Sequence, residues 1–365
     1  MVKIKASIEE IERYRPGEGI EEIAREFNLR ESQIVKLASN ENPLGPSKAG
    51  IAAILRGAGD VNVYPTADAS HLRSAICSHL GGDFGVENIV CGNGSDGVLE
   101  ALVHLFIHEG DEAIIPIPTF SFYELLVRMH GGNPVFVERD RDFGFSADDI
   151  CSRATDRTRI VFIASPNNPT GNSIDERTLR ELLGRLDALI IVDEAYVEFS
   201  SRPSFNELVL ESDNLVVTHT FSKAYGLAGM RVGYGVIPRW LSGYYMRATP
   251  PFAVNSLAEV AAIAALGDDT HLRETGRMVE DGKRYLEASI PFKVYPSDAN
   301  FVLVDVSPFK SVAISEALKR RGIIVRDCSS FRGMGDSFVR ITVGREEENK
   351  RVVEALNGYR ERCTK

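Results

Sequence analysis

The chain has 365 residues, of which 44% are hydrophobic and 26% charged, and its formal net charge is −10. This length suits one large domain plus a smaller one, because a single core stops growing at roughly 250–300 residues. The acidic balance argues against a nucleic-acid-binding protein, since counterion release needs a concentrated basic surface, and no apolar run approaches the roughly 20 residues of a membrane span.

The first segment, MVKIKASIEEIERYRPGEG, is charged and lacks the apolar core of a signal peptide, so we expect a cytoplasmic protein. Residues 20–38 have the outline of a helix-turn-helix, with a turn near Asn28 and Leu29. The acidic composition and the Asn-Glu-Asn-Pro run that follows disfavour DNA binding. We therefore expect residues 1–36 to form an N-terminal arm that packs on the body.

From about residue 70 to 240, short β-branched apolar runs alternate with amphipathic helical patterns. This order is typical of a parallel sheet covered by helices, so the predicted fold class is α/β. A large domain is expected over residues 37–250, with a mostly parallel, mixed sheet. Its predicted strands are residues 88–91, 112–117, 134–138, 159–164, 188–193, 214–219 and 232–237.

A second, smaller α+β domain is expected over residues 251–365. A long helical pattern after Pro250 and Pro251 leads out of the large domain. Three strand patterns follow it, at residues 300–306, 322–328 and 338–344. The chain shows neither an internal repeat nor a low-complexity segment.

Polar residues directly follow four of the predicted strands of the large domain. In open α/β sheets ligands bind beyond the carboxyl ends of the strands, so these residues are candidates for a site. Each alone has a structural explanation, as a turn, a helix cap or a solvated side chain, but their joint placement predicts a site. They are GNGSDG (92–97), SPNNPTG (165–171), DEAY (193–196) and TFSK (220–223).

The GNGSDG run has the G-x-G-x-x-G spacing of a dinucleotide site. The acidic ribose ligand expected about 20 residues further on is missing, because the next strand leads into PIPTFSFY. The amides of Gly94, Ser95 and Asp96 at a helix start are instead predicted to bind a phosphate. The scattered histidines and five cysteines have no metal-ligand spacing, so no metal is predicted.

Lys223 lies in a glycine-rich run, THTFSKAYGLAGMRVGYG, which also contains Arg231. A lysine, a carboxylate, an arginine and an anion-binding helix start match what pyridoxal 5′-phosphate requires. The aldehyde takes a lysine Schiff base, the pyridine nitrogen an acidic partner, and the phosphate takes amides, hydroxyls and an arginine.

With these motifs the sequence resembles the fold-type-I aminotransferases, which use pyridoxal phosphate, and within them most closely the histidinol-phosphate aminotransferases. The resemblance implies an aspartate-aminotransferase-like fold, a homodimer with shared active sites, and a C-terminal domain that clamps the substrate. The motifs occur in family order over nearly the whole chain. They are LASNENPLGPS (37–47), VYPTAD (63–68), GNGSDG (92–97), PTFSFYE (118–124), SPNNPTG (165–171), IIVDEAYVEF (190–199), TFSKAYGLAGMRVGYG (220–235), ANFVLVDV (299–306) and VRITVG (339–344).

The resemblance implies three catalytic residues. Lys223 would hold the cofactor and move the substrate α-proton, Asp193 would pair with the pyridine nitrogen, and Tyr196 would reach the phenolic oxygen together with Asn168. Phe120 would stack on the cofactor ring. The remaining implied cofactor-binding residues surround the phosphate, and they are Gly94, Ser95, Asp96, Thr220, Ser222 and Arg231, with Tyr64 from the other subunit.

The implied substrate-binding residues include two arginines, which suit anionic substrates. In FVRITVG the strand alternation puts Arg340 on the face opposite Val339 and Ile341. By resemblance Arg340 binds the carboxylate of glutamate in one half-reaction and the anion of the other substrate in the next. Arg326 and Tyr14 would help with the distal phosphate, and Asn42 of the Asn-Glu-Asn-Pro run is also placed at the substrate.

The implied reaction moves the amino group of glutamate to imidazole-acetol phosphate, giving histidinol phosphate and 2-oxoglutarate in histidine biosynthesis. An aromatic amino-acid aminotransferase on the same scaffold is the main alternative, and a phosphothreonine-decarboxylase-like enzyme is a weaker one. A transcription regulator with this cofactor is disfavoured, because only about 35 residues precede the LASNENP run. His219 and Phe120 depart from common family residues, which leaves substrate choice more open than cofactor choice.

Overall fold

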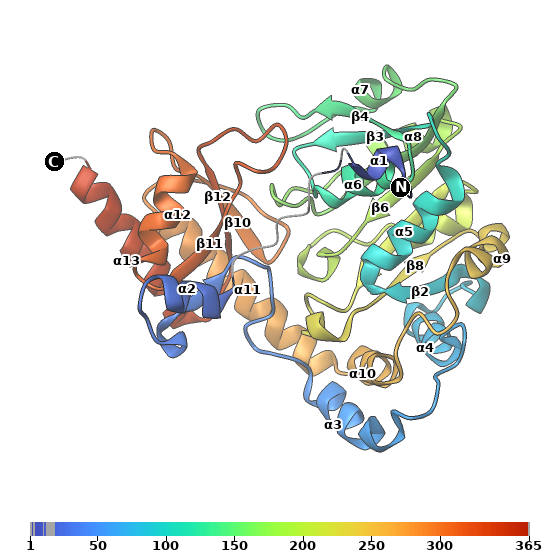
Figure 1. Cartoon of the computed structure of the whole chain (residues 1–365), viewed down its shortest axis with the longest axis horizontal. Coiled ribbons are helices and arrows are strands. Elements are labelled where there is room, and N and C mark those ends of the chain that lie inside the picture. The colour runs from blue at the N-terminus through green and yellow to red at the C-terminus, as the bar shows by residue number, and fades with distance from the viewer. Residues whose placement is uncertain (1, 3, 10, 12–18, 364–365) are drawn as a thin grey trace.

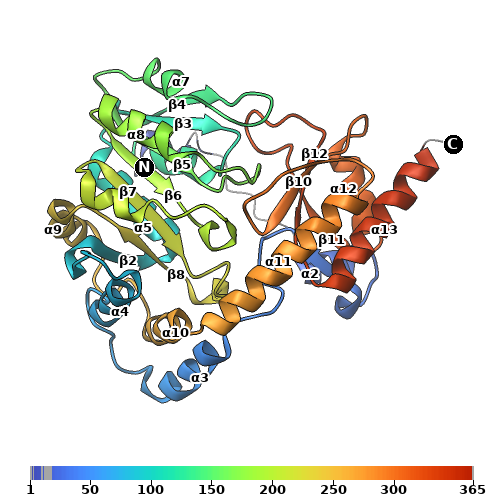
Figure 2. The same cartoon turned by 180° about the vertical axis from the view of Figure 1, so that it is seen from behind.

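The computed structural model describes residues 2, 4–9, 11 and 19–363, and it contains two β-sheets that lie in two lobes (Figures 1 and 2). We call the part built on the seven-stranded sheet the large lobe. The part built on the five-stranded sheet is the small lobe. Within the described residues no helix is long and apolar enough to cross a bilayer.

The large sheet has the strand order β2-β8-β7-β6-β5-β3-β4. The pairings among β4, β3, β5, β6 and β7 are parallel, whereas β8 is antiparallel to both β7 and β2. The mostly parallel, mixed sheet predicted from the sequence is therefore confirmed. Its strands are β2 (Ile89–Asn93), β3 (Glu112–Ile117), β4 (Asn133–Glu138), β5 (Thr158–Ala164), β6 (Leu189–Asp193), β7 (Leu215–Thr220) and β8 (Val232–Val236).

Helices cover both faces of the large sheet. Alternate residues of β6 point to opposite faces of the sheet. Ile190 and Val192 pack in the apolar cluster on one face, and Leu189 and Ile191 pack in the cluster on the other. Burial on both faces explains why these strands are continuous apolar runs. One face is covered by α4 (Ser70–Leu80), α7 (Ala147–Cys151), α8 (Glu176–Arg185) and α10 (Ser256–Leu266), and the other by α5 (Gly94–Phe106), α6 (Phe122–Met129) and α9 (Arg239–Ala248).

The small sheet has the order β1-β11-β12-β10-β9. All three strands predicted for this part of the chain are present, and the structure adds β1 and β9, which are too short for a strand pattern to be recognised. The strands are β1 (Val35–Leu37), β9 (Lys293–Tyr295), β10 (Phe301–Asp305), β11 (Ile323–Asp327) and β12 (Phe338–Thr342). Packed against them are α11 (Asp269–Ser289), α12 (Ser311–Lys319) and α13 (Glu346–Cys363).

The N-terminal segment joins the two lobes. The helix α2 (Ile20–Glu26) buries Ile23 against Ile324 of the small sheet, and β1 pairs in parallel with β11. The chain then crosses to the large lobe, where α3 (Lys48–Gly57) packs on α10, and the short helix α1 (Ala6–Glu9) contacts α6. The domain boundaries at residues 36/37 and 250/251 stay predictions.

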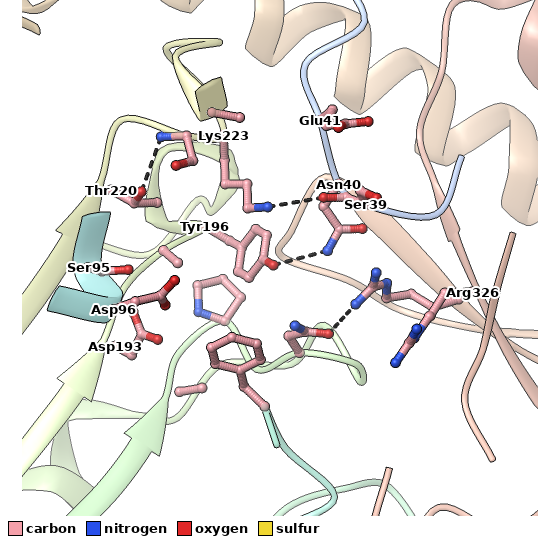
Figure 3. A pocket seen from close by; sticks show the side chains of 18 of the residues that line it. Ser39, Asn40, Glu41, Ser95, Asp96, Asp193, Tyr196, Thr220, Lys223 and Arg326 are labelled. Carbon is pink, nitrogen blue, oxygen red and sulfur yellow. Dashed lines mark hydrogen bonds between the residues drawn. The ribbon is translucent and has the colours of Figure 1, made fainter. Parts of the chain in front are cut away.

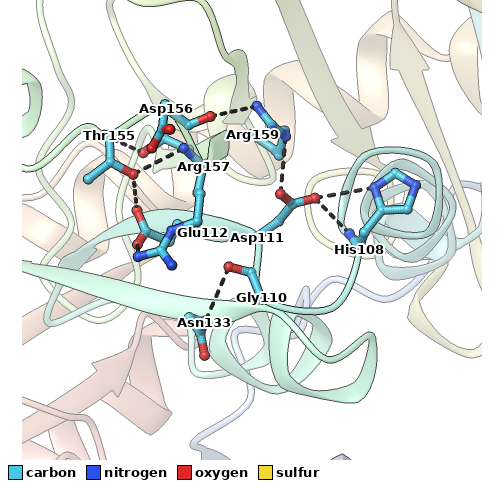
Figure 4. Close-up of polar contacts among 10 residues, drawn as sticks. His108, Gly110, Asp111, Glu112, Asn133, Thr155, Asp156, Arg157 and Arg159 are labelled. Carbon is cyan, nitrogen blue, oxygen red and sulfur yellow. Dashed lines mark hydrogen bonds and ion pairs between the residues drawn. The ribbon is translucent and has the colours of Figure 1, made fainter.

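Ion pairs fix the edge of the large sheet at which β3 and β5 begin (Figure 4). Asp111 accepts from Arg159 Nε at 3.2 Å, and Glu112 from Arg157 Nη2 at 3.1 Å and Thr155 Oγ1 at 2.6 Å. Because parallel strands start at the same edge, these contacts tie neighbouring strands together. The opposite edge, at which the strands end, is left to form a site.

Candidate active site

A cavity of about 310 Å³ lies beyond the carboxyl ends of β5, β6 and β7, between the two lobes (Figure 3). The first turn of α5 forms one wall, and β11 and β12 of the small lobe form another. The cavity brings together most of the residues selected from the sequence. They are Ser95, Asp96, Phe120, Asn168, Asp193, Tyr196, Thr220, Ser222, Lys223, Arg231, Arg326 and Arg340.

Three of the selected residues that the structure describes do not line this cavity. Gly94 precedes Ser95 at the start of α5, and Tyr64 is 79% exposed with its ring 4.8 Å from that of Phe252. Asn42 is buried and donates to Ala224 O at 2.9 Å and to Thr275 Oγ1 at 3.1 Å, so its amide is occupied within the protein. Tyr14 lies outside the described residues.

Lys223 follows β7 and reaches across the cavity to the segment that leaves the small lobe. Its Nζ donates to Ser39 O at 3.1 Å and lies 5.8 Å from the centre of the Tyr196 ring. Burial, together with the positive charge of Arg340, lowers the pKa of Lys223 to about 8. The neutral fraction of this amine near neutral pH is therefore much larger than that of an exposed lysine, which suits it to act as a nucleophile and as a base.

Asp193 is the last residue of β6 and lies between Ala164 of β5 and Thr218 of β7. Its carboxylate accepts from Tyr123 Oη at 2.6 Å and from Thr218 Oγ1 at 3.1 Å. Burial raises its pKa to about 6, and the two hydrogen bonds limit that rise. The sequence interpretation missed Tyr123, which follows Phe120 by three residues in a run that reads as apolar helix.

Tyr196 is held by Asn40, which the sequence interpretation also missed. Asn40 Nδ2 donates to Tyr196 Oη at 3.0 Å, and Asn40 Oδ1 accepts from Thr342 Oγ1 at 3.0 Å. Asn40 is 1% exposed and has a φ of 55°, a left-handed conformation that asparagine tolerates better than most residues. The Asn-Glu-Asn-Pro motif thus marked the correct segment, but Asn40 rather than Asn42 faces the cavity.

The start of α5 forms a cradle for an anion. Gly94 has a φ of 73°, and a Cβ there would lie 2.8 Å from Arg231 Nη2, so a side chain would displace that arginine. Arg231 Nη2 contacts Asp96 Oδ2 at 3.2 Å. The hydroxyls of Ser95, Thr220 and Ser222 complete the polar wall of the cavity at this end. Backbone amides, hydroxyls and an arginine at a helix N-terminus are a phosphate-binding arrangement.

Two arginines face this cradle from the small lobe. Arg340 on β12 and Arg326 on β11 are directly paired in register, so both side chains leave the same face of the small sheet. Arg340 is 5% exposed and donates to Asn168 Oδ1 and, at 2.5 Å, to Ala38 O. Arg340 is therefore a buried part of the cavity wall and not a solvated arginine on an exposed strand face. Arg326 Nη2 contacts Ser330 Oγ at 3.2 Å.

Comparisons with known proteins agree with this arrangement. Residues 32–356 match the family model for aminotransferases of class I and II. A histidinol-phosphate aminotransferase of Methanosarcina mazei is 50% identical over 354 residues, covering 97% of this chain and 95% of that protein. The crystal structure of histidinol-phosphate aminotransferase from Sinorhizobium meliloti in complex with pyridoxal-5′-phosphate has a TM-score of 0.88 at 26% identity, covering 98% and 97% of the two chains.

A further solved structure bears on the fold alone. Aspartate aminotransferase from Thermus thermophilus with maleate has a TM-score of 0.82 at 21% identity, and the match covers 97% of this chain and 99% of that one. The aspartate-aminotransferase-like architecture expected from the sequence is therefore confirmed.

Proposed function

Because the chain belongs to the aminotransferases of class I and II, we propose that it is a histidinol-phosphate aminotransferase that depends on pyridoxal phosphate. It moves the amino group of glutamate to imidazole-acetol phosphate and gives histidinol phosphate and 2-oxoglutarate in histidine biosynthesis. One observation carries the proposal: a lysine, a buried carboxylate and an anion cradle on the large lobe face two paired arginines on the small lobe.

The residues of the cavity fit pyridoxal phosphate. Because Gly94 has no Cβ, Arg231 can lie against the start of α5, on the same side of the cavity as the hydroxyls of Ser95, Thr220 and Ser222, which suits a phosphate group there. Asp193 is a buried carboxylate without an arginine or lysine partner among the described residues, so a cationic ring nitrogen would complete it. Lys223 is in place for the aldehyde. When bound, the cofactor supplies an aldehyde and a ring that withdraws electrons from the substrate α-carbon.

The protein's own groups then orient the reactants and move the proton. We propose that Lys223 Nζ takes the α-proton and returns it, and a pKa of about 8 suits both directions near neutral pH. Asp193 would stay ionised opposite the ring nitrogen, with Tyr123 and Thr218 holding its two oxygens. Asn168 and Tyr196 would bind the cofactor oxygen next to the aldehyde, and Phe120 would cover the ring.

Arg340 and Arg326 give the cavity two positive charges, which suit the two carboxylates of glutamate in one half-reaction and the phosphate of histidinol phosphate in the other. Arg340 would bind a carboxylate of glutamate, since its planar guanidinium matches that group with two hydrogen bonds. Arg326, on the neighbouring strand and nearer the loop that follows β11, would meet the distal phosphate of histidinol phosphate. A neutral aromatic side chain would leave that second charge unused, which favours a phosphorylated substrate over phenylalanine or tyrosine.

We also propose that two copies of the chain share their active sites. Tyr64 lies outside its own cavity, and its exposed ring packs against that of Phe252. Other large apolar side chains of the same stretch of chain are also exposed, namely Leu55, Val61 and Val63. Burying this surface against a second copy would let Tyr64 reach the partner's anion cradle. Sedimentation of the purified protein tests the dimer, and a monomer with full activity would contradict it.

The substrate is tested by mixing the cofactor-loaded protein with histidinol phosphate, phenylalanine or tyrosine in separate single-turnover reactions. Conversion of the cofactor to its amino form is followed by absorbance, with Lys223→Ala as the inactive control. Histidinol phosphate is expected to react with by far the highest second-order rate constant. An equal or higher constant for phenylalanine or tyrosine would make the protein an aromatic aminotransferase.

A further inference from the structure

The loop between β11 and β12, residues 328–337, reaches from the small lobe to the large lobe beside the cavity. Phe331 lines the cavity and is buried in an apolar cluster with Phe143, which follows β4 of the large lobe. A Cβ on Gly333 would lie 3.3 Å from Ile117 Cδ1, so the loop backbone touches the end of β3. This loop is therefore one of the places at which the lobes meet.

One ion pair fastens the loop to the large lobe. Arg332 Nε lies 3.0 Å from Glu124 Oε2, and Arg332 Nη2 lies 2.9 Å from Glu124 Oε1. The same guanidinium lies over the ring of Phe136, with its carbon 4.6 Å from the ring centre. Glu124 is only 21% exposed, in the first turn of α6. The parallel pair of hydrogen bonds fixes the orientation of Arg332 as well as its distance.

The residues just before Arg332 hold Arg326. Arg326 Nη2 donates to Ser330 Oγ at 3.2 Å, and the guanidinium carbon lies 5.4 Å from the centre of the Phe331 ring. A continuous series of contacts thus runs from Glu124 through Arg332 and its neighbours to Arg326. The position of Arg326 in the cavity depends on the place of the loop.

Arg340 is held differently. Its guanidinium donates to Asn168 Oδ1 of the large lobe and to Ala38 O, and neither partner belongs to the loop. Loosening the loop would therefore displace Arg326 and leave these two hydrogen bonds of Arg340 in place. Arg326 and Arg340 are paired on adjacent strands, but the loop residues Ser330 and Phe331 hold Arg326, and Asn168 and Ala38 bind Arg340.

We propose that Glu124 and Arg332 are positioning residues that set specificity for a phosphorylated substrate, because their ion pair keeps the loop, and with it Arg326, against the distal phosphate. This inference rests on the proposed function, in which histidinol phosphate is a substrate. The ion pair between Glu124 and Arg332 joins the two lobes outside the cavity. Part of the preference for a phosphorylated over an unphosphorylated substrate therefore comes from this contact.

The test compares histidinol phosphate with histidinol, which lacks only the phosphate. The dissociation constant and the maximal rate for histidinol phosphate come from single-turnover reactions, and the dissociation constant for histidinol comes from its inhibition of them. The variants are Glu124→Gln, Arg332→Met and the charge exchange Glu124→Arg with Arg332→Glu. Arg128→Met is the matched control, because Arg128 Nε also donates to Glu124 Oε1, at 3.0 Å, but lies on α6 and not on the loop.

In Glu124→Gln and Arg332→Met we expect the dissociation constant for histidinol phosphate to rise roughly threefold to tenfold, because the loop holds Arg326 in place for a smaller fraction of the time. The constant for histidinol and the maximal rate should change less than about twofold. The charge exchange should recover most of the loss, and Arg128→Met should match the unaltered protein. Melting temperatures measured for each variant keep a folding defect apart from a binding defect.

Equal losses for histidinol and histidinol phosphate would overturn the inference, since the ion pair would then shape the whole cavity. Unchanged constants in both single variants would overturn it too. If the unaltered protein fails to react with histidinol phosphate, the proposed function is wrong. That result is told apart from a failure of the inference because it is seen before any residue is changed.

Discussion

Tyr123 and Asp193, 70 residues apart in the sequence, are joined by a hydrogen bond of 2.6 Å from the phenol to Asp193 Oδ2. The donor lies on α6 and the acceptor ends β6, so a helix on one face of the large sheet holds the carboxylate at its edge. Tyr123 is itself 1% exposed and stacks on Phe162, with ring centres 4.8 Å apart. A fixed, buried donor favours the charged form of Asp193.

Tyr123→Phe should therefore raise the pKa of Asp193 above its present value of about 6. Asp193 must be ionised to pair with a cationic ring nitrogen, so cofactor affinity should fall as the pH drops through this pKa, and in the variant it should fall at a higher pH. Titrating cofactor-free protein with pyridoxal phosphate across the pH range around 6 measures the midpoint. An unchanged midpoint would show that Tyr123 does not tune the carboxylate.

Asp193→Asn should stabilise the cofactor-free protein while removing its activity. Burial raises the pKa of Asp193 from 3.8 to about 6, so this group's contribution to stability is full below pH 3.8 and is lost as the pH rises through about 6. At neutral pH the neutral amide should gain about 1–3 kcal/mol in free energy of unfolding. Urea unfolding at neutral and acidic pH checks this, and the gain should shrink at the lower pH. A variant less stable than the unaltered protein at neutral pH would refute the argument.

Asn40 should stabilise the fold through the hydrogen bonds of its side chain and also through its tolerance of a left-handed backbone conformation. Asn40→Gly removes the hydrogen bonds to Tyr196 and Thr342 but keeps a residue suited to a φ of 55°. Leaving these buried groups unpaired should cost about 1–3 kcal/mol of stability. Asn40→Ala should cost about 1 kcal/mol more, because alanine is strained in the left-handed region. Chemical unfolding of both variants measures the loss of the hydrogen bonds and the added cost of backbone strain. Equal stabilities of Asn40→Gly and Asn40→Ala would show that backbone strain at this position costs nothing.

Loss of the Asn40 contact should also change the chemistry of Tyr196. Burial raises the pKa of Tyr196, and the hydrogen bond from Asn40 opposes that rise. Both Asn40 variants should therefore slow the single-turnover reaction alike, whatever their difference in stability. A rate that follows stability instead would make Asn40 a purely structural residue.

Glu112→Gln provides a contrast at the far edge of the large sheet. Glu112 is 8% exposed and accepts from Arg157 Nη2 and Thr155 Oγ1 (Figure 4). The neutral amide keeps one acceptor and loses the ion pair, so we expect about 1–2 kcal/mol of destabilisation. Because the site lies at the opposite strand ends, single-turnover rates should not change. A reduced rate in fully folded protein would show coupling across the sheet.

The predicted site residues that the structure brings together in the cavity are those whose placement depends on local order. Lys223 and Asp193 directly follow or end apolar runs, and Arg340 interrupts an alternating strand, so strand ends and periodicity bring them to one cavity. Asn40 was missed because its partner Thr342 is 302 residues away and its orientation depends on a single backbone angle. β1 was missed because a three-residue strand carries no pattern of its own and forms only by pairing with β11.

The pairing of β1 with β11 makes the small lobe out of both ends of the chain, with the whole large lobe between them. During synthesis on the ribosome all strands of the large sheet emerge before β11 and β12. The strand β1 therefore stays unpaired until its partner β11 has been synthesised, after all strands of the large lobe. Arg326 and Arg340 arrive with those last strands. A prematurely terminated product would therefore present the lysine and the anion cradle without the arginines that choose the substrate.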